Sequence, residues 1–263
     1  MSRWLLSVGF LALFCQSAVL FAADDDELSH FRIDNTLTIR HDDEVVTIKS
    51  STIFSENRVF DFVGENGEII IYDRQAGRFS LIDPIHRIRT ELLQSDIDQF
   101  MANINSRLTE EGDRFYMFML HPEFSVARRD ELGEMLFQSK WIDYSIETRR
   151  FEDERLVRDY FEFSDAYSLL NVYLNPGTLT PLARIKVNET LREEKRFPAK
   201  ITLSVYPKGK WLFAKMIQYQ SEHQLVRRLT ESDRGKILRA VLFTEQFPKV
   251  TFGKYYKIAN SVE

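Results

Sequence analysis

The stretch Arg58–Leu93 reads RVFDFVGENGEIIIYDRQAGRFSLIDPIHRIRTELL, with short apolar runs separated by the polar sequences GENG and RQAG. The runs are rich in aromatic and β-branched residues, which favour strands. Glycine beside polar residues, placed between two such runs, is typical of a tight hairpin turn. The stretch therefore predicts an antiparallel meander, and nothing in it indicates a reaction.

Six side chains of this meander are candidates for an apolar ligand-binding face. Alternate residues of a strand point to the same side of the sheet, so these residues form one in-phase pair in each of three strands. The candidates are Phe60, Phe62, Ile70, Tyr72, Phe79 and Leu81. The register between the strands decides whether the three pairs share a face, and the sequence suggests that register without fixing it.

Two strands and a helix are predicted beside the meander. The segments Phe31–Arg40 and Glu44–Phe54 contain β-branched residues in partial alternation and predict two more strands. Ser95 and Asp98 resemble a capping box, so a helix is predicted from Ser95 to a stop at Gly112. Its apolar residues recur at helical spacing and would form one stripe against a sheet. They are Ile97, Phe100, Met101, Ile104 and Leu108.

The middle of the chain predicts further strands and one ambiguous segment. The predicted strands cover Phe115–Leu120, Phe124–Arg128, Met135–Phe151 and Leu156–Phe163. After them, apolar spacing fits a helix capped by Ser164, while Leu169–Leu174 also fits a strand. Both readings end at Asn175–Gly177, because Asn-Pro-Gly is a strong turn sequence.

The last third predicts a second meander between two helices. Thr180 and Pro181 are suited to begin a helix, which Phe197 and Pro198 would close. The later elements are strands at Ile201–Tyr206, Trp211–Tyr219 and Gln224–Leu229, a turn at Pro207–Lys210, a helix capped by Thr230 and Asp233 and ended by Phe247 and Pro248, and a terminal strand within Val250–Ile258. No low-complexity linker interrupts this order. We therefore expect one α+β domain over residues 24–263.

The first 23 residues, MSRWLLSVGFLALFCQSAVLFAA, have the features of a secretory signal peptide. A single Arg3 precedes a long apolar segment, and small residues near its end fit cleavage after Ser17, Ala22 or Ala23. The alternative is an uncleaved anchor, because the apolar segment approaches the roughly 18 residues that a membrane span needs. Cleavage is the favoured interpretation.

Cysteine use indicates the compartment. The chain has one cysteine, Cys15, which lies inside the predicted signal peptide. The mature chain would contain none, which excludes disulfides and thiolate metal sites from it. An exported protein of this size without disulfides depends on its core alone, and this favours a bacterial periplasm.

Composition and charge narrow the class of partner. The chain has 263 residues, 44% hydrophobic and 29% charged, with a formal net charge of -5. These values are typical of a globular protein, and a mildly acidic chain without a basic tail argues against nucleic acid. Three arginine pairs could meet anionic head groups in a transient membrane contact, although neighbouring acids favour ordinary surface ion pairs. The pairs begin at Arg128, Arg149 and Arg227. Nothing in the sequence indicates the oligomeric state.

The sequence contains no strong catalytic motif, and we assign it no catalytic residue, metal ligand or cofactor. Its five histidines make no local metal pair. The sharpest polar group is Asp73 with Asp83 and His86, near the ends of neighbouring predicted strands. These residues could form an acid–base cluster. The favoured interpretation is that each aspartate begins a turn.

The meander supports a resemblance to a known family. The segment VFDFVGENGEIIIYDRQAGRFSLIDPIHRIRTEL, with strands that end in Tyr-Asp and Leu-Ile-Asp-Pro, resembles the exported half-barrel proteins of the periplasmic lipoprotein-carrier superfamily, which sorts outer-membrane lipoproteins. The resemblance covers about an eighth of the chain and implies an open, curved antiparallel sheet that wraps around helices and shelters an acyl chain.

Two functional hypotheses follow. The first is a periplasmic binding or carrier protein that holds an apolar ligand, such as a lipid or the acyl chain of a lipoprotein, between the concave sheet and its helices. The second is a structural or interaction protein of the cell envelope with the same fold and a filled core. An enzyme is a third reading, and it requires Asp73, Asp83 or His86 to converge in a pocket.

Overall fold

The computed structural model describes residues 30–41, 44–64, 67–175, 178–206 and 217–259. The signal peptide predicted over residues 1–23 lies outside these ranges, as does the turn predicted at Pro207–Lys210. The strand predicted at Trp211–Tyr219 lies only partly inside them. No helix within the described ranges is long and apolar enough to cross a membrane.

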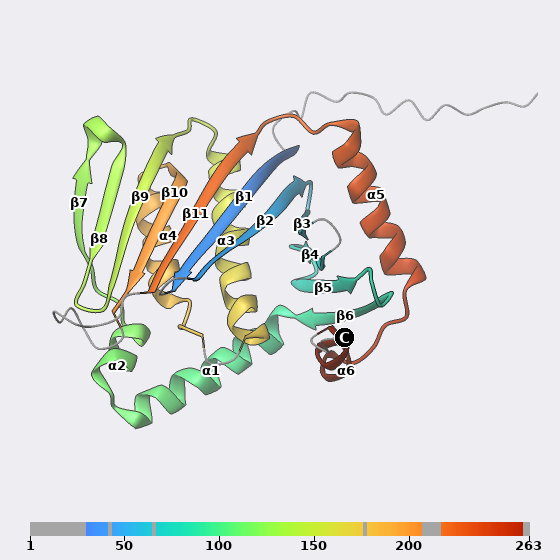
Figure 1. Ribbon diagram of the computed structural model, residues 1–263, viewed down its shortest axis with the longest axis horizontal. Helices are drawn as coiled ribbons and strands as arrows, with labels where there is room; N and C mark the ends of the chain where they lie inside the picture. The colour runs from blue at the N-terminus through green and yellow to red at the C-terminus, as the bar shows by residue number, and fades with distance from the viewer. Residues whose placement is uncertain (1–29, 42–43, 65–66, 176–177, 207–216, 260–263) are drawn as a thin grey trace, which may run out of the picture.

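The fold is built on one antiparallel sheet of eleven strands, with the order β6-β5-β4-β3-β2-β1-β11-β10-β9-β8-β7 (Figure 1). The sheet is curved and open, with β6 and β7 as its two edges. The strands are β1 (His30–His41), β2 (Glu44–Ser55), β3 (Arg58–Val63), β4 (Ile69–Asp73), β5 (Arg78–Asp83), β6 (Ile88–Leu93), β7 (Ser125–Arg129), β8 (Glu134–Gln138), β9 (Ile142–Arg150), β10 (Arg196–Val205) and β11 (Ile217–Val226). The predicted α+β class with a large, curved, open antiparallel sheet is confirmed.

The meander at Arg58–Leu93 forms β3 to β6 in sequential hairpins. In the β4–β5 hairpin Asp73 pairs with Arg78, and the turn between them ends at Gly77 with a φ of 54°. Glycine is favoured there because a side chain in this left-handed region is strained. The peptide oxygen of Gly77 also accepts a hydrogen bond from the Gln94 N–H at 2.8 Å, so this turn holds the start of the following helix.

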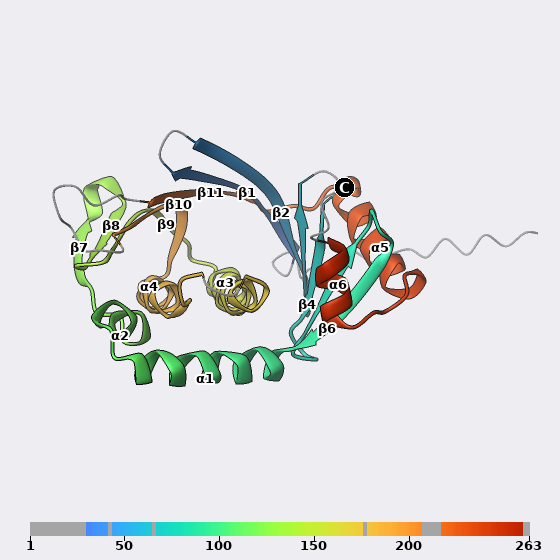
Figure 2. The same ribbon diagram turned by 60° about the horizontal axis from the view of Figure 1, so that its bottom comes forward.

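Six α-helices lie within the described ranges, and they cover both faces of the sheet (Figure 2). They are α1 (Gln94–Glu111), α2 (Arg114–Leu120), α3 (Glu154–Leu174), α4 (Leu182–Glu193), α5 (Glu231–Gln246) and α6 (Phe252–Ala259), and a 3-10 turn, η1, spans Asp130–Leu132. Helices α3 and α4 lie against the concave face, and α1 passes beneath them. Helix α5 packs on the opposite face, against β3 to β5.

Three predicted strands are helices, because helix caps and helical spacing prevail over strand propensity. Phe115–Leu120 lies in α2, where the Asp113 carboxylate accepts hydrogen bonds from the N–H groups of the first turn. Leu156–Phe163 opens α3, which Asp153 caps through the Leu156 N–H at 3.0 Å. Ser164 is therefore internal to a helix. The terminal strand predicted within Val250–Ile258 is replaced by α6.

Helix boundaries were predicted with mixed success. Thr230 and Asp233 form the expected capping box at the start of α5. The box predicted at Ser95 does not form, since α1 begins at Gln94 without a side-chain cap. Phe197 and Pro198 do not close α4 directly; they belong to β10, after the helix has ended at Glu193.

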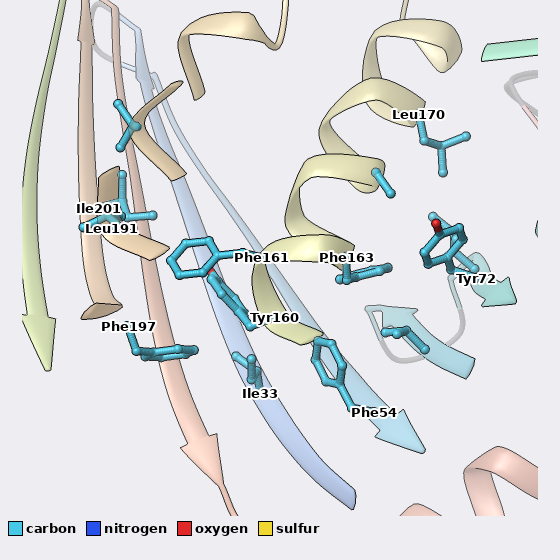
Figure 3. Close-up of a cluster of buried hydrophobic side chains, with 14 of the residues drawn as sticks. Ile33, Phe54, Tyr72, Tyr160, Phe161, Phe163, Leu170, Leu191, Phe197 and Ile201 are labelled. Atoms are coloured by element: carbon cyan, nitrogen blue, oxygen red, sulfur yellow. The ribbon is translucent and has the colours of Figure 1, made fainter. Parts of the chain in front are cut away.

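The sheet separates two apolar cores. The large core lies on the concave face, where Tyr160, Phe161 and Phe163 of α3 meet side chains of the sheet (Figure 3). The Phe163 ring lies 5.7 Å from the Phe54 ring of β2, centre to centre. The small core lies under α5 and contains Phe60, with Phe62 at its margin.

Candidate ligand-binding cavity

A cavity of about 550 Å³ lies between the concave face of the sheet and helices α3 and α4. Its volume falls within the roughly 300–1,000 Å³ of small-molecule pockets. Strands β1, β2, β3, β9, β10 and β11 form its floor, and α3, α4 and the segment before α4 form its roof. Two exposed residues, Ile48 and Asn171, are among the lining residues, so the cavity reaches the surface.

The lining is mainly apolar and aromatic, as in pockets that hold apolar ligands. Its apolar and aromatic members are Ile33, Leu37, Ile48, Phe54, Val63, Met119, Ile142, Tyr144, Tyr160, Phe163, Tyr167, Val172, Leu179, Pro181, Ala183 and Leu203. Each sheet residue in this set occupies the inward phase of its strand. For example, Ile33 and Leu37 of β1 lie four residues apart and therefore point to the same side.

A row of hydrogen-bonded polar side chains crosses the floor of the cavity. Asn35 Oδ1 lies 2.8 Å from Nδ1 of His223, and Asn35 Nδ2 donates to the Thr52 hydroxyl at 2.9 Å. The Thr52 hydroxyl in turn donates to Asp61 at 2.7 Å. The phenol of Tyr167 also hydrogen-bonds to Asp61, which ties α3 to the row. The polar row therefore extends from β11 to β3.

The strand register produces this row. Asn35 pairs with His223 on one side and with Ser50 on the other, and Thr52 pairs with Asp61. Each of these residues occupies the inward, apolar phase of its strand. In the sequence, the signal for this row is a polar residue at a position where strand alternation predicts an apolar one. Its hydrogen-bond partners can be identified only once the register is known.

Burial controls the protonation of Asp61 and Tyr167. Burial raises the pKa of Asp61, although hydrogen bonds from Thr52, Ser50 and Tyr167 oppose this effect. Burial and the nearby carboxylates of Asp61 and Glu68 raise the pKa of Tyr167 well above its ordinary value. Three hydroxyl groups thus satisfy the Asp61 carboxyl, which supports the cavity wall.

The other end of the row lies beside a cation. Arg184, in the first turn of α4, lines the cavity and hydrogen-bonds to the Tyr160 phenol. Burial, and then the positive charge of Arg184, lower the pKa of His223 to about 3, so this imidazole is neutral at pH 7. Burial raises the pKa of the nearby Tyr144 to about 12. This end therefore presents one cation among neutral donors and acceptors.

The six predicted face residues do not lie together, and none is among the residues that line the cavity. The register pairs Tyr72 with Phe79 and Ile70 with Leu81, and these four residues lie in the concave core. Phe60 pairs with Ile71, and with Phe62 it lies on the opposite face, under α5. The three pairs therefore do not share one face of the sheet, because Phe60 and Phe62 lie on the side away from the other four candidates.

Asp73, Asp83 and His86 do not form the acid–base cluster that was the alternative interpretation. Asp73 and Asp83 lie at opposite ends of the β4–β5 ladder. Asp73 accepts a hydrogen bond from the Ala76 N–H at 3.0 Å, and Asp83 accepts from the N–H groups of Ile85 and His86. His86 Nδ1 lies 2.6 Å from the Asp83 carboxylate. The favoured interpretation of these aspartates as turn residues is confirmed.

Within the described ranges, no group of three or more His, Cys, Asp or Glu side chains is arranged to hold a metal ion. The first arginine pair forms surface ion pairs, Arg128 with Glu194 at 2.7 Å and Arg129 with Glu134 at 2.9 Å.

No protein-family model matches the chain, and no curated protein matches it.

Proposed function

We propose that this protein is an exported, periplasmic binding or carrier protein that holds an apolar ligand in its half-barrel. The ligand class is a lipid or the acyl chain of a lipoprotein. One observation carries the proposal, the cavity of about 550 Å³ that lies between the concave sheet and α3 and α4 and reaches the surface. Apolar and aromatic side chains make up most of its lining, and polar side chains accompany them, as is usual in small-molecule sites.

The polar row supports a binding role because it gives the cavity wall a defined shape. Asn35 donates a hydrogen bond to Thr52, and Thr52 donates one to Asp61. Buried polar groups that are fully hydrogen-bonded make a rigid surface. A rigid, largely apolar wall binds an alkyl chain with little loss of conformational freedom in the protein.

The family resemblance of the meander and the signal-peptide pattern at residues 1–23 are in keeping with this proposal. The alternative of a filled-core envelope protein accounts for the Tyr72 and Phe79 end of the sheet, where side chains fill the concave face. It does not account for the cavity. For that reason we favour a carrier or binding role.

Native mass spectrometry without detergent tests the proposal. The protein is expressed with its own first 23 residues and recovered from the periplasmic fraction. We expect a processed chain that begins after Ser17, Ala22 or Ala23 and that carries a bound alkyl-chain compound. A processed chain with no bound compound, which also fails to bind alkyl chains in titration, would overturn the binding role. Retention of the full-length chain in the membrane would overturn the periplasmic localisation.

A further inference from the structure

The titratable groups that line the cavity differ in their hydrogen-bond partners. Asp61 accepts hydrogen bonds from three hydroxyl groups, and His223 has Asn35 and Ser221 as partners. Arg184 is the only Arg or Lys among the described lining residues. No carboxylate in the described part of the chain forms an ion pair with it, and the Tyr160 phenol is its neutral partner.

A guanidinium beside an apolar cavity is costly without an anion. Removing a cation from water costs free energy that an anionic partner offsets, and planar guanidinium groups are well suited to carboxylates and phosphates. Elsewhere in this fold, partly buried arginines have such partners. Arg32 binds Asp233 at 2.8 Å and Arg74 binds Asp159 at 2.9 Å. Arg184 therefore differs from these structural arginines in having a neutral phenol, and not a carboxylate, as its partner.

The position of Arg184 places this charge at one end of the cavity. Its charge acts on Tyr144 of β9, Tyr160 of α3 and His223 of β11. Asp61 lies on β3, three strands from β11 and five from β9 in the sheet order. At about 4.8 Å between strands, this separation is roughly 14 Å or more along the sheet. The apolar floor between them includes Ile33 and Phe54.

We propose that Arg184 binds the anionic head group of a single-chain amphiphile whose alkyl chain lies along the apolar floor of the cavity. The head group is a carboxylate or a phosphate ester, and the phenol of Tyr160 contributes a further hydrogen bond to it. This inference rests on the proposed function and names the ligand class that the same cavity takes. It assigns a role to a residue that the sequence pattern did not single out.

Calorimetric titration of the delipidated protein separates the two proposals. The probes share a twelve-carbon chain and are laurate, dodecyl phosphate, 1-dodecanol, methyl laurate and dodecylamine, the ionic probes below their micelle concentrations and the neutral probes below their solubility limits. We expect the two anions to bind about tenfold more tightly than the neutral probes, as charged hydrogen bonds allow. The ratio between laurate and dodecyl phosphate distinguishes a fatty-acid ligand from a phosphate-bearing one.

Variants of Arg184 test the assignment of the site. Arg184→Met should reduce the preference for anions to less than about twofold, and Arg184→Lys should retain part of it. Lys186→Met is the matched control, because Lys186 lies on the same helix with an exposed side chain that pairs with Glu189. It removes the same charge outside the cavity and should leave the preference intact.

The outcomes of the titration are distinct. If no probe binds, the proposed function fails, and this inference fails with it. If all probes bind the wild-type protein equally, the binding function stands and the head-group site is wrong. This result comes from the wild-type protein alone, so it does not depend on whether the Arg184 variants fold. Tighter binding of dodecylamine would place the head group at Asp61 and also overturn the proposal.

Discussion

The Nδ1 atom of His223 lies 2.8 Å from Oδ1 of Asn35, and the two residues are directly paired across β11 and β1. Asn35 uses its amide nitrogen to donate to Thr52 and Ser50, so its oxygen faces the imidazole. Nδ1 of His223 then donates, and Nε2 accepts from the Ser221 hydroxyl at 3.1 Å. The polar row therefore holds His223 in one neutral form beside the cavity.

The neutral state of His223 predicts a pH dependence of stability. Burial lowers the pKa of the folded imidazole from 6.5 to about 3. Below pH 6.5 the unfolded chain binds a proton that the folded chain does not, so this contribution to stability is present above 6.5 and is lost as the pH falls. The loss is at most about 1.4 kcal/mol per pH unit. Urea unfolding should show a shallower decline between pH 6.5 and 5 for His223→Gln, and identical slopes would contradict this account.

Asp61 predicts a dependence of the opposite sign. Burial raises the pKa of this carboxyl above 3.8, so the folded state favours the protonated form. The stabilisation is fully present below pH 3.8 and is lost as the pH rises through the folded pKa. The free energy of unfolding of Asp61→Asn, relative to that of the wild type, should therefore increase as the pH rises from 4 to 7.

Asp61→Leu is the contrasting variant. It removes the acceptor for Thr52, Ser50 and Tyr167, and we expect a loss of about 1–3 kcal/mol in the free energy of unfolding. The measurement is urea unfolding of both variants at pH 4 and pH 7. A difference between Asp61→Asn and the wild type that does not change with pH would show that the carboxyl is not perturbed.

The two faces of the meander should respond differently to truncation. Phe79 is fully buried in the concave core and stacks on Tyr72, with ring centres 4.5 Å apart. Phe79→Ala should cost about 3–5 kcal/mol in the free energy of unfolding. Phe62 lies at the margin of the outer core beside Lys236, so Phe62→Ala should cost only about 1 kcal/mol. Equal costs in chemical denaturation would contradict the placement of Phe79 at a fully buried site and of Phe62 at the margin of its core.

The attachment of α5 to the sheet depends on Asp233. Its carboxylate accepts hydrogen bonds from the N–H and hydroxyl of Thr230, as one half of the capping box, and also binds Arg32 of β1 at 2.8 Å. Burial opposes ionisation, but hydrogen bonds from Thr230 and Arg32 hold the pKa of Asp233 below its ordinary value. Asp233→Ala should cost about 2–4 kcal/mol, because it removes a cap and a charged hydrogen bond together.

Two variants control for this prediction in thermal or urea unfolding. Thr230→Ala removes the hydroxyl half of the capping box, keeps the Arg32 contact, and should cost about 1 kcal/mol. Glu245→Ala removes an exposed acid near the other end of α5 and should change stability by less than about 0.5 kcal/mol. A cost for Asp233→Ala no greater than that for Thr230→Ala would mean that the Arg32 contact contributes nothing.

Local patterns were enough to predict the meander, the α5 cap and the fold class. The strand error at Leu156–Phe163 has a physical cause. Val157, Tyr160, Phe161 and Ser164 fit helical spacing, but aromatic and β-branched residues also favour strands, and the Asp153 cap decides between the two. Short apolar runs carry both patterns, so their type depends on the surrounding structure.

The candidate cavity could not be predicted from the sequence, for a different reason. Asn35, Asp61 and His223 are far apart in the chain, and only the pairing of β11 with β1, and of β2 with its neighbours, brings them into one row. The same register places Phe60 opposite Ile71 and so directs it away from the cavity. Alternation within a strand is local information, whereas register between distant strands is not.

The central claim is that the cavity between the concave sheet and α3 and α4 holds an alkyl chain, and a cavity-filling variant tests it most directly. Leu203→Trp adds volume to the floor of the cavity, while Leu132→Trp adds the same ring at an exposed site on η1. The measurement is calorimetric titration of the three proteins with methyl laurate, which depends on the cavity and not on a charge. We predict that the wild type and Leu132→Trp bind alike and that Leu203→Trp binds at least about tenfold more weakly, since the ring occupies the space of the chain. Equal binding by all three proteins, or no binding by the wild type, would contradict the claim.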